Sequence, residues 1–155
     1  MAETDFIVDK ENLEVRTSRV FEASPQRLWQ AYTDPTEIPK WWGPGYLDTV
    51  VDKMDIRIGG QWRFIQTEPD GKEHAFSGVY KEVVEPKRLV DTFEYEPIAG
   101  HILVETMTLE VVEAGKTKLS STAKYANLED LEGMVSMGME GGQRESMDRL
   151  AKLVS

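Results

Sequence analysis

An alternation of apolar and polar residues from Tyr46 to Tyr125 limits the possible folds more than any other feature of this sequence. A period of two is typical of strands that bury one face, and no helical window of useful length interrupts it. Turn signals divide the segment at 59–60, 68–71, 85–86, 97–100 and 113–115. Because these connections are short, the strands should be antiparallel neighbours. The pattern predicts strands over 46–55, 60–67, 73–84, 88–95, 101–112 and 116–125.

The residues before and after this segment predict one further strand and three helices. Residues 13–22 are rich in β-formers, which favours a first strand. Ser24 and Asp34 each precede a proline and predict the starts of two helices, the second of them short because Pro39 disfavours helical backbone in the residue before it. Asn127 predicts the start of a final helical region. Segregated strands and helices of this kind indicate an α+β fold.

The length and charge of the chain bound its organisation and its partners. At 155 residues we expect a single domain over 12–155, preceded by an N-terminal arm over 1–11. The net charge of −10 argues against nucleic acid and anionic membranes as partners, because both attract basic proteins. No signal peptide, membrane span or cysteine is found, so we expect a cytoplasmic protein and a monomer.

The final helix carries an inward stripe and an unusual group of glycines. Met139, Gln143 and Met147 recur at helical spacing and should face the sheet. Gln143 would either orient a ligand or bond to the sheet backbone. Glycines 138, 141 and 142 each weaken a helix by about 1 kcal/mol relative to alanine, so they indicate either a kink or a close approach of backbone.

Glu105 is an acid on a strand face that is otherwise apolar. A buried carboxylate without a partner is costly, so Glu105 should become neutral, pair with Arg63 or Arg57, or reach solvent through a twist of the strand. In the first case it is a candidate catalytic acid or base. His74 and His101 lie on different strands without a ligand-like acidic pattern, so we expect no metal, and nothing indicates a cofactor.

Several segments share their order and spacing with one known family. They are Val20 to Pro25, Asp34-Pro35, Trp41-Trp42-Gly43-Pro44, Asp55 to Phe64, Gly78-Val79-Tyr80, Glu85 to Val90, and Met147-Asp148-Arg149-Leu150. From about Val15 to Leu153 the chain resembles the activator of heat-shock protein 90 ATPase homologue family of the START-like (SRPBCC, Bet v 1-like) superfamily. The resemblance implies a helix-grip fold, with a seven-stranded curved antiparallel sheet around a long C-terminal helix, two short helices after strand 1, and an apolar cavity between sheet and helix.

The expected function is therefore the binding of a small hydrophobic or amphipathic ligand in that cavity. Trp41-Trp42 should form either a gate at its mouth or a plug, and Trp62 and Phe64 either its wall or plain core. A cyclase- or aromatase-like enzyme using Glu105 and a chaperone ATPase regulator are the alternative functions. The candidate ligand-binding residues are Trp29, Trp42, Trp62, Phe64, Phe76, Phe93, Tyr95, Met107, Met139, Gln143 and Met147.

Overall fold

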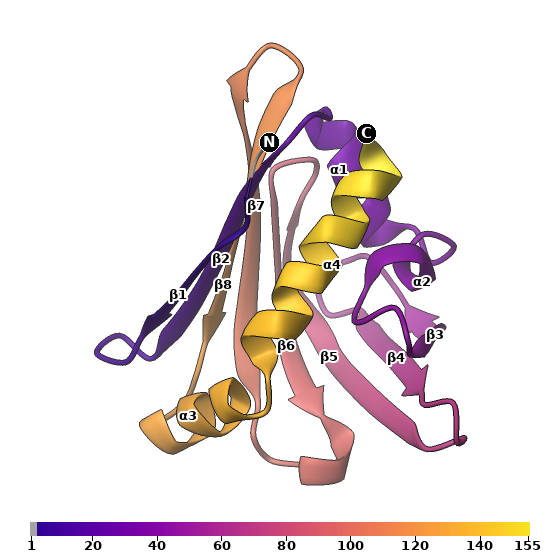
Figure 1. Ribbon diagram of the computed structural model, residues 1–155, viewed down its shortest axis with the longest axis vertical. Helices are drawn as coiled ribbons and strands as arrows, with labels where there is room; N and C mark the ends of the chain where they lie inside the picture. The colour runs from indigo at the N-terminus through magenta and orange to yellow at the C-terminus, as the bar shows by residue number, and fades with distance from the viewer. Residues whose placement is uncertain (1–2) are drawn as a thin grey trace.

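The computed structural model describes residues 3–155 and contains one antiparallel sheet curved around a C-terminal helix (Figure 1). The sheet has eight strands in the order β1-β2-β8-β7-β6-β5-β4-β3. Seven of them lie within a few residues of the segments expected from the alternation. The strands are β1 (Asp5–Asp9), β2 (Glu14–Phe21), β3 (Asp48–Met54), β4 (Gln61–Thr67), β5 (Glu73–Val84), β6 (Arg88–Tyr95), β7 (Leu103–Glu113) and β8 (Lys116–Lys124).

The expected count of seven strands is wrong by one, because residues 5–9 of the predicted arm form β1. This strand pairs with β2, with Phe6 opposite Thr17 and Val8 opposite Val15. Asp9 closes the hairpin by accepting hydrogen bonds from the backbone N–H of Asn12 at 3.0 Å. Five residues with two inward apolar side chains are too short a pattern to separate from a loop. Residues 1 and 2 of the predicted arm lie outside the described residues.

Two short helices follow β2, as the proline signals predict. α1 (Pro25–Thr33) begins where the Ser24 hydroxyl accepts from the backbone N–H of Arg27 at 3.1 Å. α2 (Ile38–Trp41) begins later than expected, because Asp34 forms a turn with Thr36 and Pro39 occupies the first turn of the helix, where it needs no N–H. The two helices close one end of the curved sheet.

The C-terminal helical region is broken rather than continuous. α3 (Leu128–Ser136) begins at its cap Asn127, and α4 (Met139–Val154) is the longer helix that the sheet surrounds. Gly138 separates them with a φ of +85°, a left-handed conformation that ends the first helix. A Cβ added to Gly141 or Gly142 would meet no atom within 4 Å, so close approach is not the reason for these glycines. The expectation of one uninterrupted helix is corrected to two.

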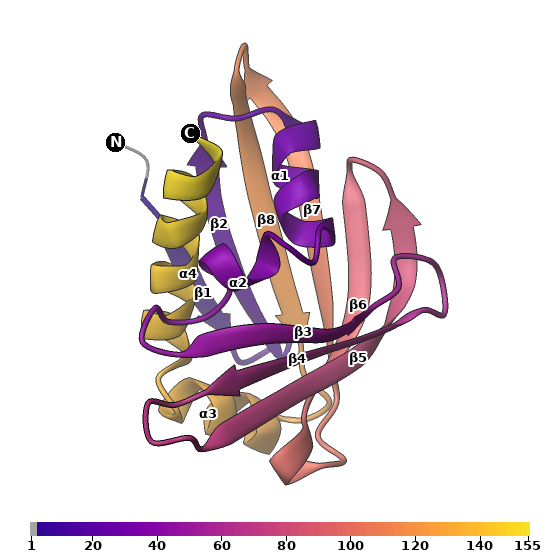
Figure 2. The same cartoon turned by 90° about the vertical axis from the view of Figure 1, so that its right-hand side faces the viewer.

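The sheet is strongly twisted, so that β3, β4 and β5 run steeply across the direction of β2, β8 and β7 (Figure 2). α4 packs along the concave side, with Met147 and Leu150 fully buried in the main core together with Trp29 and Leu119. A second apolar cluster around Val15 lies between the β1 end of the sheet and α3. No helix within residues 3–155 is long and apolar enough to cross a membrane.

Candidate functional site

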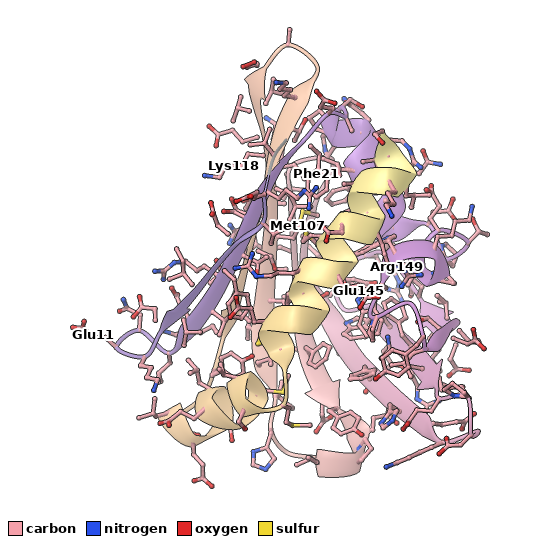
Figure 3. All side chains as sticks on the ribbon, in the orientation of Figure 1. Glu11, Phe21, Met107, Lys118, Glu145 and Arg149 are labelled. Carbon is pink, nitrogen blue, oxygen red and sulfur yellow. The ribbon has the colours of Figure 1, made fainter. Side chains whose placement is uncertain are left out.

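A cavity of about 630 Å³ lies between the concave side of the sheet, α4 and the loop after α2. Its volume is within the range of small-molecule sites. Residues of β4 to β8 form one wall, and Met139, Gln143 and Met147 of α4 form the other. Figure 3 shows Met107 between the sheet and α4. A smaller hollow of about 260 Å³ beneath α3 shares Phe93, Tyr95 and other residues with it.

Nearly all the residues predicted from the sequence line this cavity. Trp29 does not, because α1 turns it into the main core, where it is 5% exposed. A helical aromatic next to a sheet is as well suited to core packing as to a cavity wall, and the sequence alone does not separate the two. The predicted residues in the lining are Trp42, Trp62, Phe64, Phe76, Phe93, Tyr95, Glu105, Met107, Met139, Gln143 and Met147.

Aromatic rings on neighbouring strands form a connected wall. The Trp42 ring meets Phe64 and Phe76 edge-on, with centroids 5.1 and 5.3 Å apart. The ring centroid of Trp62 lies 4.8 Å from that of Phe64 and 5.9 Å from that of Phe93. Edge-on and tilted contacts of this kind are favourable beyond the area they bury. The ligand would therefore meet a preformed set of ring faces and edges.

The position of Trp62 depends on Gly78 of the neighbouring strand. The indole Nε1–H of Trp62 donates to the Thr92 carbonyl at 3.1 Å, which crosses β5 beside Gly78. A Cβ at position 78 would lie 1.8 Å from that carbonyl oxygen and 2.6 Å from Nε1. Only glycine leaves room for this bond. Packing therefore explains why glycine occupies the first position of the Gly78-Val79-Tyr80 segment.

The two adjacent tryptophans have different roles. Trp41 is buried, donates from Nε1 to the Ala31 carbonyl at 2.9 Å and packs against Tyr32, so it plugs the end of the sheet. Trp42 is half-buried and forms part of the aromatic wall. Trp41 also borders the cavity, so the structure favours the predicted plug at Trp41, whereas a gate at the cavity mouth stays a prediction.

α4 holds the loop after α2 against this end of the cavity. Glu145 accepts from the backbone N–H of Gly45 at 2.6 Å, and Arg149 donates to the Gly43 carbonyl at 2.8 Å. Ser146 accepts from the N–H of Gly43 at 3.0 Å. Figure 3 shows Glu145 and Arg149 on the side of α4 that faces this loop. The loop is therefore tied to the helix through its backbone.

Glu105 faces the cavity, and its neighbour is another acid. Asp91 of β6 lies directly opposite Glu105 of β7 in the strand register, and both side chains line the cavity. The expected arginine partners are engaged elsewhere: Arg63 donates to Glu96 at 2.9 Å, and Arg57 pairs with Asp55 at 2.7 Å. Of the alternatives drawn from the sequence, neutralisation of Glu105 therefore applies.

Asp91 and Glu105 are close enough for each to change the pKa of the other. Burial raises the pKa of Asp91 well above its ordinary value, and the charge of Glu105 raises it further. Burial also raises the pKa of Glu105, against the opposing effect of Asp91. Like charges this close in an apolar site cannot both ionise easily, so the pair titrates as one unit.

Sequence reasoning singled out Glu105 and missed its partner. Asp91 and Glu105 lie equally far along the chain from Ile98, in the turn between the two strands. A hairpin centred on that turn places them opposite each other, so the register could have been found from the turn position.

The phenol groups of three tyrosines, Tyr32, Tyr80 and Tyr125, also lie in this part of the cavity. Burial raises the pKa of each phenol, and the negative charge of the acidic pair adds to the effect. They are therefore neutral hydrogen-bonding groups at ordinary pH.

Both histidines form hydrogen bonds, and each bonded ring nitrogen has one partner. His74 lies 2.6 Å from the Tyr95 hydroxyl through Nδ1 and 2.6 Å from Glu68 through Nε2. His101 pairs with Asp130 at 2.7 Å. Within residues 3–155, no three His, Asp or Glu side chains gather as a metal ion would need.

An α+β sheet that grips a C-terminal helix over an apolar cavity defines a START-like, helix-grip protein. The sequence profile described as "Activator of Hsp90 ATPase homolog 1-like protein" matches residues 22–155, and the chain belongs to that family. The resemblance seen in the sequence is confirmed, and so is the fold class, with the strand count corrected.

Solved structures agree with this assignment. Protein Ms6760 from Mycobacterium smegmatis is 28% identical, with a TM-score of 0.85 over 97% of this chain and 96% of its own. Protein CV1439 from Chromobacterium violaceum is 28% identical, with a TM-score of 0.81 over 92% and 96%. The AHSA1 protein SPO3351 from Silicibacter pomeroyi is 22% identical, with a TM-score of 0.72 over 90% and 95%, and supports the fold alone. No curated protein matches the chain in sequence.

Proposed function

We propose that this protein binds a small apolar or amphipathic molecule, with lipids and polyketides among the candidates, in the cavity between the sheet and α4. The observation that carries the proposal is the space of about 630 Å³, in which 16 of the 33 described lining residues are Phe, Trp, Tyr or Met. Pockets of this size with a few convergent polar groups are typical of small-molecule sites. Methionines on α4 would adapt their shape to the guest.

The ligand-binding residues in this proposal are those of the aromatic wall and of the α4 stripe. Trp42, Trp62 and Phe93 would contact the apolar body of the ligand through ring faces and edges. Gln143, which is half-buried at the cavity wall, would orient a polar group. Glu105 and Asp91 are the acidic groups among the described lining residues of the sheet.

Filling the cavity from α4 tests the proposal. Gly142 lines the cavity and Gly141 does not, although both are open to an added side chain. Gly142→Leu should abolish or weaken at least about tenfold the binding of an apolar fluorescent probe, because leucine occupies the space of the guest. Gly141→Leu, the matched control, should bind as the parent does. Equal probe binding by both variants would place the ligand elsewhere, and no binding by the parent would refute the proposal.

An acid–base enzyme of the cyclase or aromatase type is a second candidate, favoured by the carboxyl pair in the cavity. A carboxyl whose pKa is raised by burial is a suitable proton donor near neutral pH. Turnover of a cyclisable polyketide that is lost in Glu105→Gln, with binding retained, would support it. Binding without turnover would leave the carrier function alone.

Regulation of a chaperone is a third candidate, and it rests on the description of the family. An ATPase assay of the 90-kDa heat-shock chaperone with and without this protein tests it directly. Unchanged ATPase activity at saturating protein would reject it.

We further propose that the protein acts as a cytoplasmic monomer. The sheet and α4 of one chain supply both walls of the cavity. Light scattering of the purified protein should give a mass near 17.6 kDa.

A further inference from the structure

The charged side chains that line the cavity are acidic. Asp91, Glu105 and Glu145 are among the described lining residues, and none of those residues is a lysine or an arginine. Glu145 is engaged with the backbone of Gly45, so Asp91 and Glu105 are the acidic lining residues that remain for a ligand. An anionic ligand would lie near two acidic groups, with no lysine or arginine among the described lining residues to balance its charge. Electrostatic repulsion should therefore disfavour anionic ligands.

The acidic pair lacks a donor from the rest of the protein. The Oδ1 atom of Asp91 is buried, and no N–H or O–H group in residues 3–155 reaches it. Because two like charges side by side repel, the pair favours holding a proton, in line with the raised pKa of Asp91. A proton on the pair supplies one positive charge. A cationic hydrogen-bond donor from a ligand could take the place of that proton.

The walls next to the pair suit the same kind of ligand. Phe93 is on the same strand as Asp91. The Trp62 ring packs against the Phe93 ring, with 5.9 Å between the two centroids. Tyr32 and Tyr80 lie near enough to the pair for its charge to raise their pKa values. Ring faces attract cations within about 6 Å, and more strongly where water is excluded.

We propose that the ligand of this cavity is an amphipathic amine, whose protonated nitrogen binds the Asp91–Glu105 pair while its apolar body lies against the aromatic wall. This inference rests on the proposed ligand-binding function and specifies the class of ligand. An ammonium group offers three donors and no acceptor, which matches two ionised carboxylates because these only accept.

Binding of such an amine releases protons. The cation stabilises the ionised form of the pair, so any proton that the pair holds is released to the buffer. An alkylamine has a pKa close to that of lysine, about 10.4, and stays protonated while the pair loses its proton. The affinity should therefore rise with pH. The other titratable groups that line the cavity, from α1, β5, β6, α4 and the segment after β8, are Tyr32, His74, Tyr80, Tyr95, Tyr125 and Glu145.

Three probes with the same chain and different head groups test the proposal by titration calorimetry: decylamine, 1-decanol and decanoate, each below its aggregation concentration. Decylamine should bind at least about tenfold more tightly than decanol, the gain of a charge-assisted hydrogen bond, and decanoate should bind most weakly. Repeating the decylamine titration in buffers of different ionisation enthalpy should show net proton release.

Neutral variants of the pair supply the second measurement. In Asp91→Asn/Glu105→Gln the preference for decylamine over decanol should fall to about onefold, and proton release should disappear. Glu110→Gln is the matched control, because it removes a carboxylate from the exposed side of β7. It should keep the full preference.

The outcomes separate the two levels of the proposal. Equal or tighter binding of decanol or decanoate, or decylamine binding without proton release, overturns the amine inference and leaves ligand binding standing. Failure of all three probes, and of an apolar fluorescent probe, overturns ligand binding as well.

Discussion

Asp91 and Glu105 are half-buried side chains that line the cavity, because β6 and β7 turn the same face toward it. In the sequence, Glu105 stands out as an acid on an otherwise apolar strand face, whereas Asp91 does not. Their chemistry changes because burial raises both pKa values and because each is the nearest acidic neighbour of the other. The position of a carboxyl group in the fold, and not its residue type, decides its protonation state.

The raised pKa values predict how the stability of the unliganded protein depends on pH. The folded protein holds protons that the unfolded chain releases, so the free energy of unfolding should fall as the pH rises through the pKa of the folded pair. The loss is about 1.4 kcal/mol for each unit by which a pKa is raised. Asp91→Asn supplies Glu105 with a fixed donor and should make this fall smaller. Urea unfolding at a series of pH values measures it.

Glu110→Gln serves as the control for that experiment, since its carboxylate is exposed. It should follow the parent curve. Two results would contradict the raised pKa values of the pair. One is a parent protein whose free energy of unfolding does not change over this pH range, and the other is an Asp91→Asn protein whose free energy of unfolding falls as steeply as that of the parent.

Gly78 gives a second prediction at the level of one residue. Gly78→Ala places a Cβ against the Thr92 carbonyl and the Trp62 indole, and backbone cannot yield as a flexible side chain would. We expect a loss of about 3 kcal/mol in urea unfolding, with altered Trp62 fluorescence. Gly133→Ala, on α3 with no atom within 4 Å of the added Cβ, should not be destabilised. A Gly78→Ala protein as stable as the parent would mean that β5 and β6 can separate without cost.

At the level of elements, the break between α3 and α4 lets one helical segment cover two different parts of the sheet. α3 packs over the Val15 cluster through Leu131, whereas α4 lies along the main core through Leu150. A continuous helix would run straight past one of these clusters. The left-handed residue Gly138 makes the change of direction possible (Figure 1).

Gly138→Ala and Gly141→Ala should therefore change stability in opposite directions. Alanine at 138 must adopt a left-handed conformation, at a cost of about 1–2 kcal/mol. Alanine at 141 lies inside α4 with open space around its Cβ, so it should stabilise the helix by up to about 1 kcal/mol. Thermal and urea unfolding of the two variants measure both effects. A stabilised Gly138→Ala protein would show that the break is not required by the fold.

On the scale of the whole molecule, the cavity couples ligand binding to stability. A ligand that binds only the folded state raises the free energy of unfolding by about 2.7 kcal/mol at one hundred times its Kd. For a chain of this size the midpoint of thermal unfolding should rise by roughly 5–10 °C. Differential scanning calorimetry with a saturating ligand measures the rise. The Gly142→Leu protein should show no such shift, and a ligand-induced rise in that variant would locate binding outside the cavity.

Strands β3 to β8 and their consecutive antiparallel pairing could be predicted from local patterns, because the alternation is long and its turns are marked by glycine and proline. The pairing of β2 with β8 joins segments far apart in the chain, and no local pattern predicts it. β1 was missed because five residues carry too little pattern. The split at Gly138 was foreseen only as one of two alternatives, since a glycine in a helix indicates a kink or a close contact equally well. Trp29 was misplaced because helical spacing does not tell core from cavity wall.

By itself, the amino-acid sequence determined the α+β architecture, the family and most of the side chains that face inward, because periodicity, turns and caps act over a few residues. The tertiary structure alone decided that the interior is hollow, that Asp91 and Glu105 lie opposite each other in it with raised pKa values, and that no lysine or arginine is among the described lining residues. These properties depend on distances between strands and helices, and on the exclusion of water, which arise only when separate segments pack together.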